Sequence, residues 1–78
     1  MKGRAVAPSK DSTRIAAMRA ADVAQVRAWA AQYGVSLFGS DDLLLYSIHD
    51  ARAVMLEATK DERQASRDWL ATHDAPVA

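Results

Sequence analysis

One segment of this 78-residue chain carries both a start signal and a stop signal for a helix. Asp22 can accept a hydrogen bond from the free amide groups of a first helical turn, and Gln25 follows three residues later. Gly34 supplies a residue that readily adopts the left-handed conformation in which many helices end. The sequence therefore predicts a helix over residues 23–33, and the rest of the chain has to pack on it.

Helical character begins before this segment. Ser12 or Thr13 can cap a helix, and the stretch Arg19–Ala21 that follows has high helix propensity. This pattern favours one long helix over residues 13–33. The alternative is a break before Asp22, which would give two shorter helices.

Three further cap signals divide the second half of the chain. Ser40 or Asp41 caps a short helix that runs to Tyr46. Ser47–Asp50 opens another helix, whose apolar residues recur at helical spacing. Thr59–Glu62 has the spacing of a reciprocal capping box and begins a last helix, which Pro76 prevents from continuing.

These elements predict an all-α fold, a small bundle of three longer helices plus one short helix. The helices form a single domain over residues 12–75. Residues 1–11 contain two helix breakers, Gly3 and Pro8, together with three cations, and they show no apolar periodicity. We therefore expect residues 1–11 to form a flexible basic arm.

The predicted core is small. Half of the residues are hydrophobic, but 17 of them are alanine, so large apolar side chains are scarce. In so short a chain, apolar burial at about 25 cal/mol per Å² barely offsets an ordering cost of about 1.5 kcal/mol per residue. The composition therefore favours self-association as a source of further stability.

The residues that enzyme sites need are mostly absent. His49 and His73 are not spaced as paired metal ligands. We interpret His49 as a partly exposed side chain near a cap, His73 as a residue that suits a helix C-terminus, and Asp41–Asp42 as capping residues. No glycine-rich phosphate loop is present. We predict a chain that is not an enzyme and has no cofactor, bound metal or small-molecule substrate.

Two features of the sequence indicate a location. The chain has no cysteine, which excludes disulfides and fits a reducing cytoplasm. No apolar run approaches the roughly 20 residues of a membrane span, and the first residues lack the apolar stretch of a signal peptide. We therefore expect a cytoplasmic protein without a membrane partner.

The charges are unevenly distributed, although the net charge is zero. Residues 1–40 hold six cations and two carboxylates, a net charge of +4, whereas residues 41–78 hold four cations and eight carboxylates, a net charge of −4. Such asymmetry favours a basic surface that meets phosphate or an acidic partner, or molecules whose ends attract one another. The cations that would contact nucleic acid are Lys2, Arg4, Lys10, Arg14, Arg19 and Arg27. Alternatively, these side chains only solvate an exposed helix face.

Residues 30–36, Ala-Ala-Gln-Tyr-Gly-Val-Ser, resemble the first helix and turn of helix-turn-helix proteins, in which a small residue precedes the turn glycine by four positions. Extended over residues 22–36, the stretch is also similar to the DNA-binding domain of actinobacterial nucleoid-associated silencers, where a Trp-Ala helix ends in a glycine turn. The resemblance implies a small regulatory protein that binds DNA. The helix-turn-helix would be degenerate, because residues 37–43 carry two carboxylates and no cation.

The alternative function is an oligomerising protein-protein interaction module or adaptor that does not bind nucleic acid. Large apolar side chains would anchor a second copy or another protein, because buried aromatic residues carry much interface energy. The predicted anchors are Met18, Trp29, Leu45 and Trp69. Salt separates the two functions, because phosphate contacts weaken steeply with ionic strength and apolar contacts do not.

Overall fold

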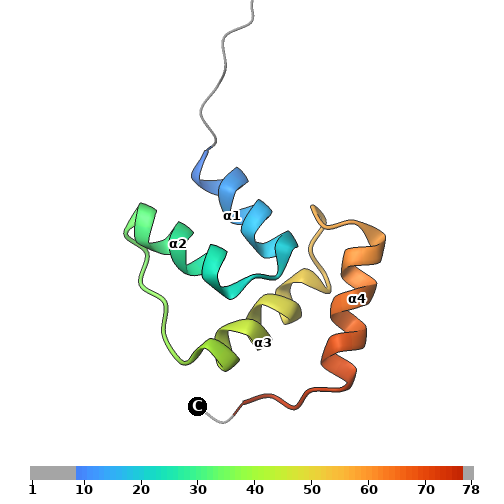
Figure 1. The fold of residues 1–78 in the computed structure, drawn as a ribbon. Helices are drawn as coiled ribbons and strands as arrows, with labels where there is room; N and C mark the ends of the chain where they lie inside the picture. Colours follow the sequence, from blue (N-terminus) through green and yellow to red (C-terminus); the bar gives the residue numbers. More distant parts are fainter. Residues whose placement is uncertain (1–8, 77–78) are drawn as a thin grey trace, which may run out of the picture.

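The computed structural model describes residues 9–76 and contains four α-helices in that part of the chain. They are α1 (Lys10–Ala20), α2 (Val23–Tyr33), α3 (Asp41–Arg52) and α4 (Lys60–Ala71). α1 packs against α2, and α3 lies between this pair and α4 (Figure 1). The predicted all-α fold is confirmed, and α3 is its central helix.

Each helix begins at a side chain that accepts a hydrogen bond from a backbone amide three residues further on. The four bonds join the amide of Ser12 to Ser9, Gln25 to Asp22, Leu43 to Ser40 and Glu62 to Thr59, at 3.0, 3.2, 3.2 and 3.0 Å. The Glu62 carboxylate also accepts from the Thr59 amide at 2.8 Å, which completes the capping box. The predicted caps at Asp22, Ser40 and Thr59 are therefore confirmed.

Residues 10–33 form two helices and not the single long helix that helix propensity favoured. Ala21 adopts a left-handed conformation with a φ of 51°, and its amide donates to the Met18 carbonyl at 3.0 Å. Such a conformation costs a residue other than glycine about 1–2 kcal/mol. The Asp22 cap and the packing of α1 against α2 offset this cost, because a straight helix could not fold back on itself.

The first helix also begins earlier than predicted. Ser9, and not Ser12 or Thr13, is its cap, and the hydroxyls of Ser12 and Thr13 donate to the Ser9 carbonyl at 3.1 and 2.9 Å. Lys10 is consequently the first residue of α1 and not part of an arm. Asp11, also predicted in the arm, lies in the first turn of α1, and residues 1–8 of the predicted arm lie outside the described residues.

α3 runs unbroken from Asp41 to Arg52, whereas the sequence predicted a short helix to Tyr46 and a new start at Ser47. The Ser47 hydroxyl donates to the Leu43 carbonyl one turn back at 3.0 Å, so Ser47 lies within the helix and caps nothing. Residues 53–58, predicted as the end of that second helix, form a loop of turns instead. The four helices are therefore of nearly equal length, 11 or 12 residues.

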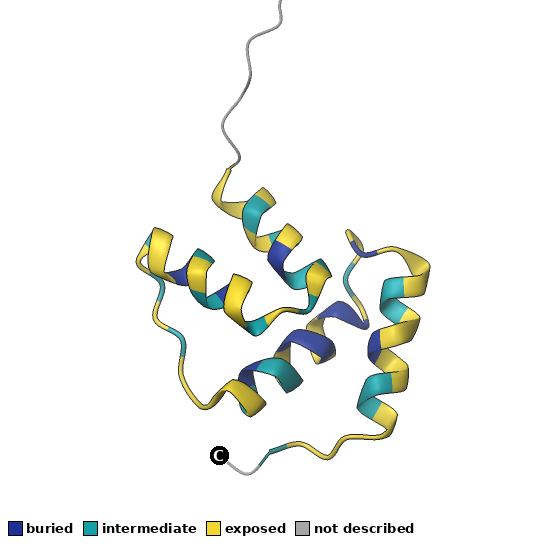
Figure 2. Ribbon diagram, in the orientation of Figure 1, coloured by how far each residue is buried: buried dark blue, intermediate teal, exposed yellow. Residues whose placement is uncertain are grey.

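The core lies where α1, α2 and α3 meet. Its large apolar members are Val26, Leu44 and Ile48, and the small side chain of Ala17 lets α1 approach them. Buried residues are concentrated on α3, which faces the α1–α2 pair with some of them and α4 with others (Figure 2). Within residues 9–76, Val26, Leu44 and Ile48 are the only buried apolar residues larger than alanine.

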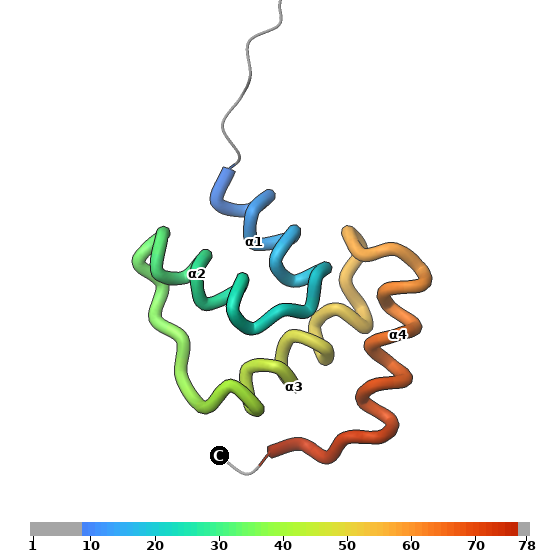
Figure 3. The backbone as a smooth tube through the Cα atoms, in the orientation of Figure 1, coloured from blue at the N-terminus to red at the C-terminus, as the bar shows by residue number. Residues whose placement is uncertain are grey.

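Two connections determine where the site forms. α2 ends at Gly34, which has a φ of 67° as predicted, and residues 35–40 cross to the start of α3. After α4, residues 72–76 turn back beneath α3 (Figure 3). This last segment encloses a cavity against the first half of α3.

Candidate interaction site

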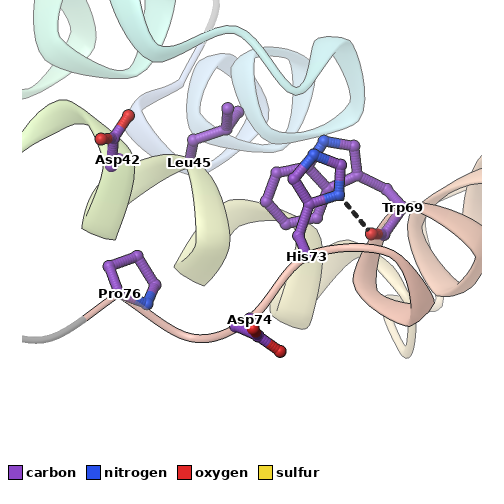
Figure 4. Close-up of a pocket in the computed structure, with 6 residues that line it drawn as sticks. All are labelled: Asp42, Leu45, Trp69, His73, Asp74 and Pro76. Atoms are coloured by element: carbon purple, nitrogen blue, oxygen red, sulfur yellow. Dashed lines mark hydrogen bonds between the residues drawn. The ribbon is translucent and has the colours of Figure 1, made fainter.

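A cavity of about 490 Å³ lies between α3, the end of α4 and the segment that follows α4 (Figure 4). We term it the Trp69 pocket; its lining residues are Asp42, Leu45, Trp69, His73, Asp74 and Pro76. Its volume is in the range of about 300–1,000 Å³ typical of ligand pockets. The sequence predicts both Leu45 and Trp69 as interface anchors, and the fold brings them to one cavity.

Trp69 is held between two imidazole rings. The ring of His49, from α3, stacks on one side at a centroid distance of 4.2 Å and an interplanar angle of 13°. The ring of His73 stacks at 3.9 Å and 7°. Tyr46 meets the indole at a tilted angle of 58° and 5.9 Å. These three contacts fix the orientation of the indole as a wall of the pocket.

The end of α4 holds His73 in this stack. His73 follows Trp69 by four residues, the spacing that places two side chains on the same side of a helix. Its Nδ1 atom lies 2.7 Å from the Trp69 carbonyl oxygen and 3.0 Å from the Thr72 hydroxyl. The Trp69 carbonyl also accepts from the Thr72 amide and hydroxyl, at 3.2 and 3.1 Å, so the end of α4 orients one ring of the pocket through this carbonyl.

A buried polar cluster contacts the stack through the ring of His49. Ser66 is fully buried, and its Oγ accepts a hydrogen bond from Arg52 Nε at 2.6 Å. The same Oγ lies 3.0 Å from Nδ1 of His49 and can donate its proton to it. Arg52 also donates to the Arg19 carbonyl at 2.7 Å, which links the cluster to α1. No buried side-chain polar atom within residues 9–76 lacks a hydrogen-bond partner.

Burial lowers the pKa of His49, and the positive charge of Arg52 and the proximity of His73 lower it further. A neutral imidazole at this position matches its role as acceptor for the Ser66 hydroxyl. The expectation that His49 is partly exposed near a cap is wrong, because only 7% of the residue is exposed. Its helix begins at Asp41, so His49 lies in the last turns of α3, where it faces α4.

Sequence reasoning missed Ser66 and Arg52 entirely. A signal existed in the spacing, because Glu62, Ser66, Trp69 and His73 recur at intervals of four, three and four residues. This series forms one side of α4 and its continuation. Polar residues dominate the series, so it does not stand out as a buried face.

The pocket is acidic at its rim. Asp42 comes from the first turn of α3 and Asp74 from the segment after α4, and both are exposed. Neither carboxylate takes part in an ion pair with any residue between 9 and 76. Leu45 and Pro76 form apolar parts of the pocket lining. The pocket therefore combines an apolar interior with two carboxylates from different elements.

The other two predicted anchors lie elsewhere. Met18 lines a separate groove between α1 and the end of α3. Trp29 is half-buried on α2, where its Nε1 donates to the Lys10 carbonyl at 2.9 Å and its ring contacts Tyr33 at 5.9 Å. Trp29 thus helps to fasten α2 to the start of α1 and does not contribute to the Trp69 pocket.

The predicted basic surface is partly committed to contacts within the molecule. Arg19 forms an ion pair with Glu62 at 2.9 Å, and Arg27 forms one with Asp41 at 2.7 Å. Lys10 and Arg14 are exposed; the Lys10 ammonium lies 5.9 Å from the Trp29 ring, and Arg14 is 4.0 Å from Asp11. Lys2 and Arg4 lie outside the described residues.

The described part of the chain holds no group of three or more side chains able to bind a metal ion. Among the same residues, no helix has the length and apolar character needed to cross a membrane. No protein-family model, curated protein or solved structure matches this chain.

Proposed function

We propose that this chain is a non-enzymatic protein-protein interaction module, and that the Trp69 pocket binds a segment of a partner protein. The observation that carries the proposal is the meeting of Leu45 and Trp69 in one cavity whose indole wall is fixed by stacked rings. A preorganised wall favours binding, because little side-chain freedom is lost when a ligand arrives.

The lining of the pocket supports one class of ligand. Leu45 and Pro76 favour an apolar side chain, while Asp42 and Asp74 favour a cation. A peptide segment that presents a lysine or arginine next to a leucine or an aromatic residue satisfies both requirements.

Selection from a random peptide library displayed on phage tests this function. The chain is immobilised, and enriched peptides are then measured singly for binding to the wild type and to Leu45→Glu. We expect enriched peptides to share a cation beside an apolar residue. We also expect Leu45→Glu to weaken their binding by at least about tenfold, which corresponds to about 1.4 kcal/mol.

Phe38→Ser provides the matched control, because Phe38 is 87% exposed and does not line the pocket. This variant should bind the selected peptides as well as the wild type does. The proposal is wrong if no peptide is enriched, or if Leu45→Glu and Phe38→Ser bind the selected peptides equally.

A second function, DNA binding by a regulatory protein with a degenerate helix-turn-helix, is favoured by the exposure of Lys10 and Arg14 on α1. In the sequence, the basic residues Lys2 and Arg4 precede these two cations by six to twelve positions. In this alternative, α1 and the preceding residues contact phosphates, since α3 begins with carboxylates that phosphates would repel.

Binding to random duplex DNA at about 50 and about 200 mM salt tests this second function. The informative variant is Lys10→Glu/Arg14→Glu, because reversal of Arg19 or Arg27 would also break an ion pair between helices. Binding that is lost at the higher salt and in this variant would favour the DNA function. Absence of binding at the lower salt concentration would rule out the DNA-binding function.

A further inference from the structure

A second surface of the molecule is apolar and exposed. Within residues 9–76, three large apolar side chains are almost fully exposed: Phe38 at 87%, Val54 at 77% and Leu56 at 91%. Val54 and Leu56 lie two residues apart in the loop between α3 and α4. Residues 9–76 therefore expose as many large apolar side chains as they bury, and two of the exposed ones lie in the same loop.

A groove of about 240 Å³ lies at this loop, and Val54 is one of its lining residues. The apolar part of its lining comes from Ile15 and Met18 of α1 and from Ala51, Val54 and Met55 at the end of α3 and in the loop that follows. A cavity of roughly 150 Å³ already accepts benzene, so this groove has room for a leucine side chain. Leu56 is not among the residues that line it. An apolar projection and an apolar groove therefore occur side by side.

The loop that carries the projection is fixed by α4. Its turns are closed by three backbone hydrogen bonds: Val54 to Ala51, Met55 to Arg52 and Ala58 to Met55, each at 3.2 Å. Two arginines of α4 donate to loop carbonyls: Arg67 to Ala53, and Arg63 to Met55 and Ala58. The backbone on both sides of Leu56 is thus held by hydrogen bonds.

The groove also carries one charge of each sign. Arg14 and Glu57 both line it. Arg14 lies 4.0 Å from Asp11, but both side chains are more than half exposed, and such a pair is easily exchanged for another. Glu57 forms no ion pair with any residue between 9 and 76. A surface with equal and opposite charges beside an apolar projection and groove is complementary to itself.

We propose that this surface, the Leu56 face, binds a second copy of the chain in a two-fold symmetric dimer. Leu56 of each copy enters the groove of the other, and Arg14 pairs with the partner's Glu57. Two-fold symmetry makes both contacts twice, because each copy offers the same surface. The Trp69 pocket lies outside this contact, so the dimer does not depend on the proposed partner binding.

Sedimentation of the full chain from about 5 to about 500 µM at low salt tests the dimer. We expect the mass to approach twice the monomer mass of 8.5 kDa as concentration rises. Leu56→Asp should weaken the dimer by at least about tenfold, whereas the equally exposed Phe38→Ser should leave it unchanged. Circular dichroism shows whether each variant keeps its helices.

A charge exchange tests the two-fold arrangement. Arg14→Glu alone and Glu57→Arg alone should each weaken self-association, because like charges then face each other. An equal mixture of the two variants should form a dimer again, since one copy supplies two carboxylates and the other supplies two arginines. A chain that stays monomeric throughout, a dimer that Leu56→Asp leaves intact, or a mixture that fails to associate would each overturn the proposal.

Discussion

Ser66 is the residue that connects the packing of α4 on α3 to the pocket. Its hydroxyl lies between Arg52 Nε and His49 Nδ1, and the His49 ring in turn stacks on Trp69. Hydrogen bonds that involve a charged donor are stronger than neutral ones. The position of the indole therefore depends on a side chain that does not itself line the pocket.

Ser66→Ala should lower the free energy of unfolding by about 2 kcal/mol, because it leaves a buried guanidinium N–H and an imidazole nitrogen without a partner. Urea unfolding followed by circular dichroism measures the change. Ser47→Ala is the control: Ser47 is exposed and donates only within α3, so about 0.5 kcal/mol or less is expected. Equal losses in the two variants would contradict the role assigned to Ser66.

His49 makes the stability of the fold depend on pH. The groups that face it are Arg52 of its own helix, and Ser66, Trp69 and His73 from α4 and its continuation. Its pKa is lowered in the folded chain, so the unfolded chain binds the proton more readily. The contribution of neutral His49 is complete above the ordinary histidine pKa near 6.5 and is lost as the pH falls below it.

We therefore expect the His49 contribution to the free energy of unfolding to stay nearly constant from about pH 7.5 to about pH 6.5 and to decrease from there toward pH 5, below the unfolded-state histidine pKa. His49→Gln should flatten this dependence, because glutamine does not titrate. Urea titrations at three pH values across this range measure the effect. An unchanged slope in His49→Gln, or a stability that rises toward pH 5, would rule out His49 as its source.

At the scale of elements, the turns between helices set the topology. α2 ends at Gly34 with a φ of 67°, and a Cβ added there would meet no atom within 4 Å. The requirement for glycine at this position is therefore one of backbone conformation alone. Ala21, with a φ of 51°, shows that the fold tolerates the same conformation without glycine where packing offsets the cost.

Gly34→Ala should lower the free energy of unfolding by about 1–2 kcal/mol, the cost of a left-handed alanine. Ser36→Ala, an exposed change in the same connection, should have little effect. Thermal unfolding measures both variants. A Gly34→Ala protein as stable as the wild type would show that this turn relaxes without strain.

Local signals explain which elements the sequence predicts well. The caps at Asp22, Ser40 and Thr59 and the stop at Gly34 each depend on a few adjacent residues. The break at Ala21 and the continuity of α3 through Ser47 depend instead on packing between helices. Helix propensity alone favours one unbroken helix over α1 and α2. Propensity does not include the apolar surface that is buried when the two helices pack against each other.

The candidate site was only partly predictable for the same reason. Leu45 and Trp69 are recognisable as anchors by their size, but they are 24 positions apart and meet only because residues 72–76 return beneath α3. The supporting cluster of His49, Arg52 and Ser66 consists of polar side chains. Polar residues are usually exposed, so their burial follows from mutual hydrogen bonds that spacing does not reveal.

At the scale of the whole molecule, the uneven charge distribution allows ion pairs between the two halves of the chain. Arg19 and Arg27 of the basic half pair with Glu62 and Asp41 of the acidic half. The Arg19 guanidinium and the Thr59 amide hold the pKa of Glu62 below its usual range. These pairs join α1 to α4 and α2 to α3. Part of the asymmetry therefore joins helices to one another. Asp42 and Asp74 of the Trp69 pocket form no ion pair with any cation of the described residues.

The most direct test of partner binding is a ¹H–¹⁵N NMR titration of the full chain with a selected peptide, because the two tryptophan indole N–H groups give separate signals. The indole of Trp69 and the amides of Asp42 and Leu45 should shift, while the indole of Trp29 should not, since it is engaged with the Lys10 carbonyl. Shifts confined to α1 and Trp29, with Trp69 unchanged, would contradict the assignment of the pocket as the binding site.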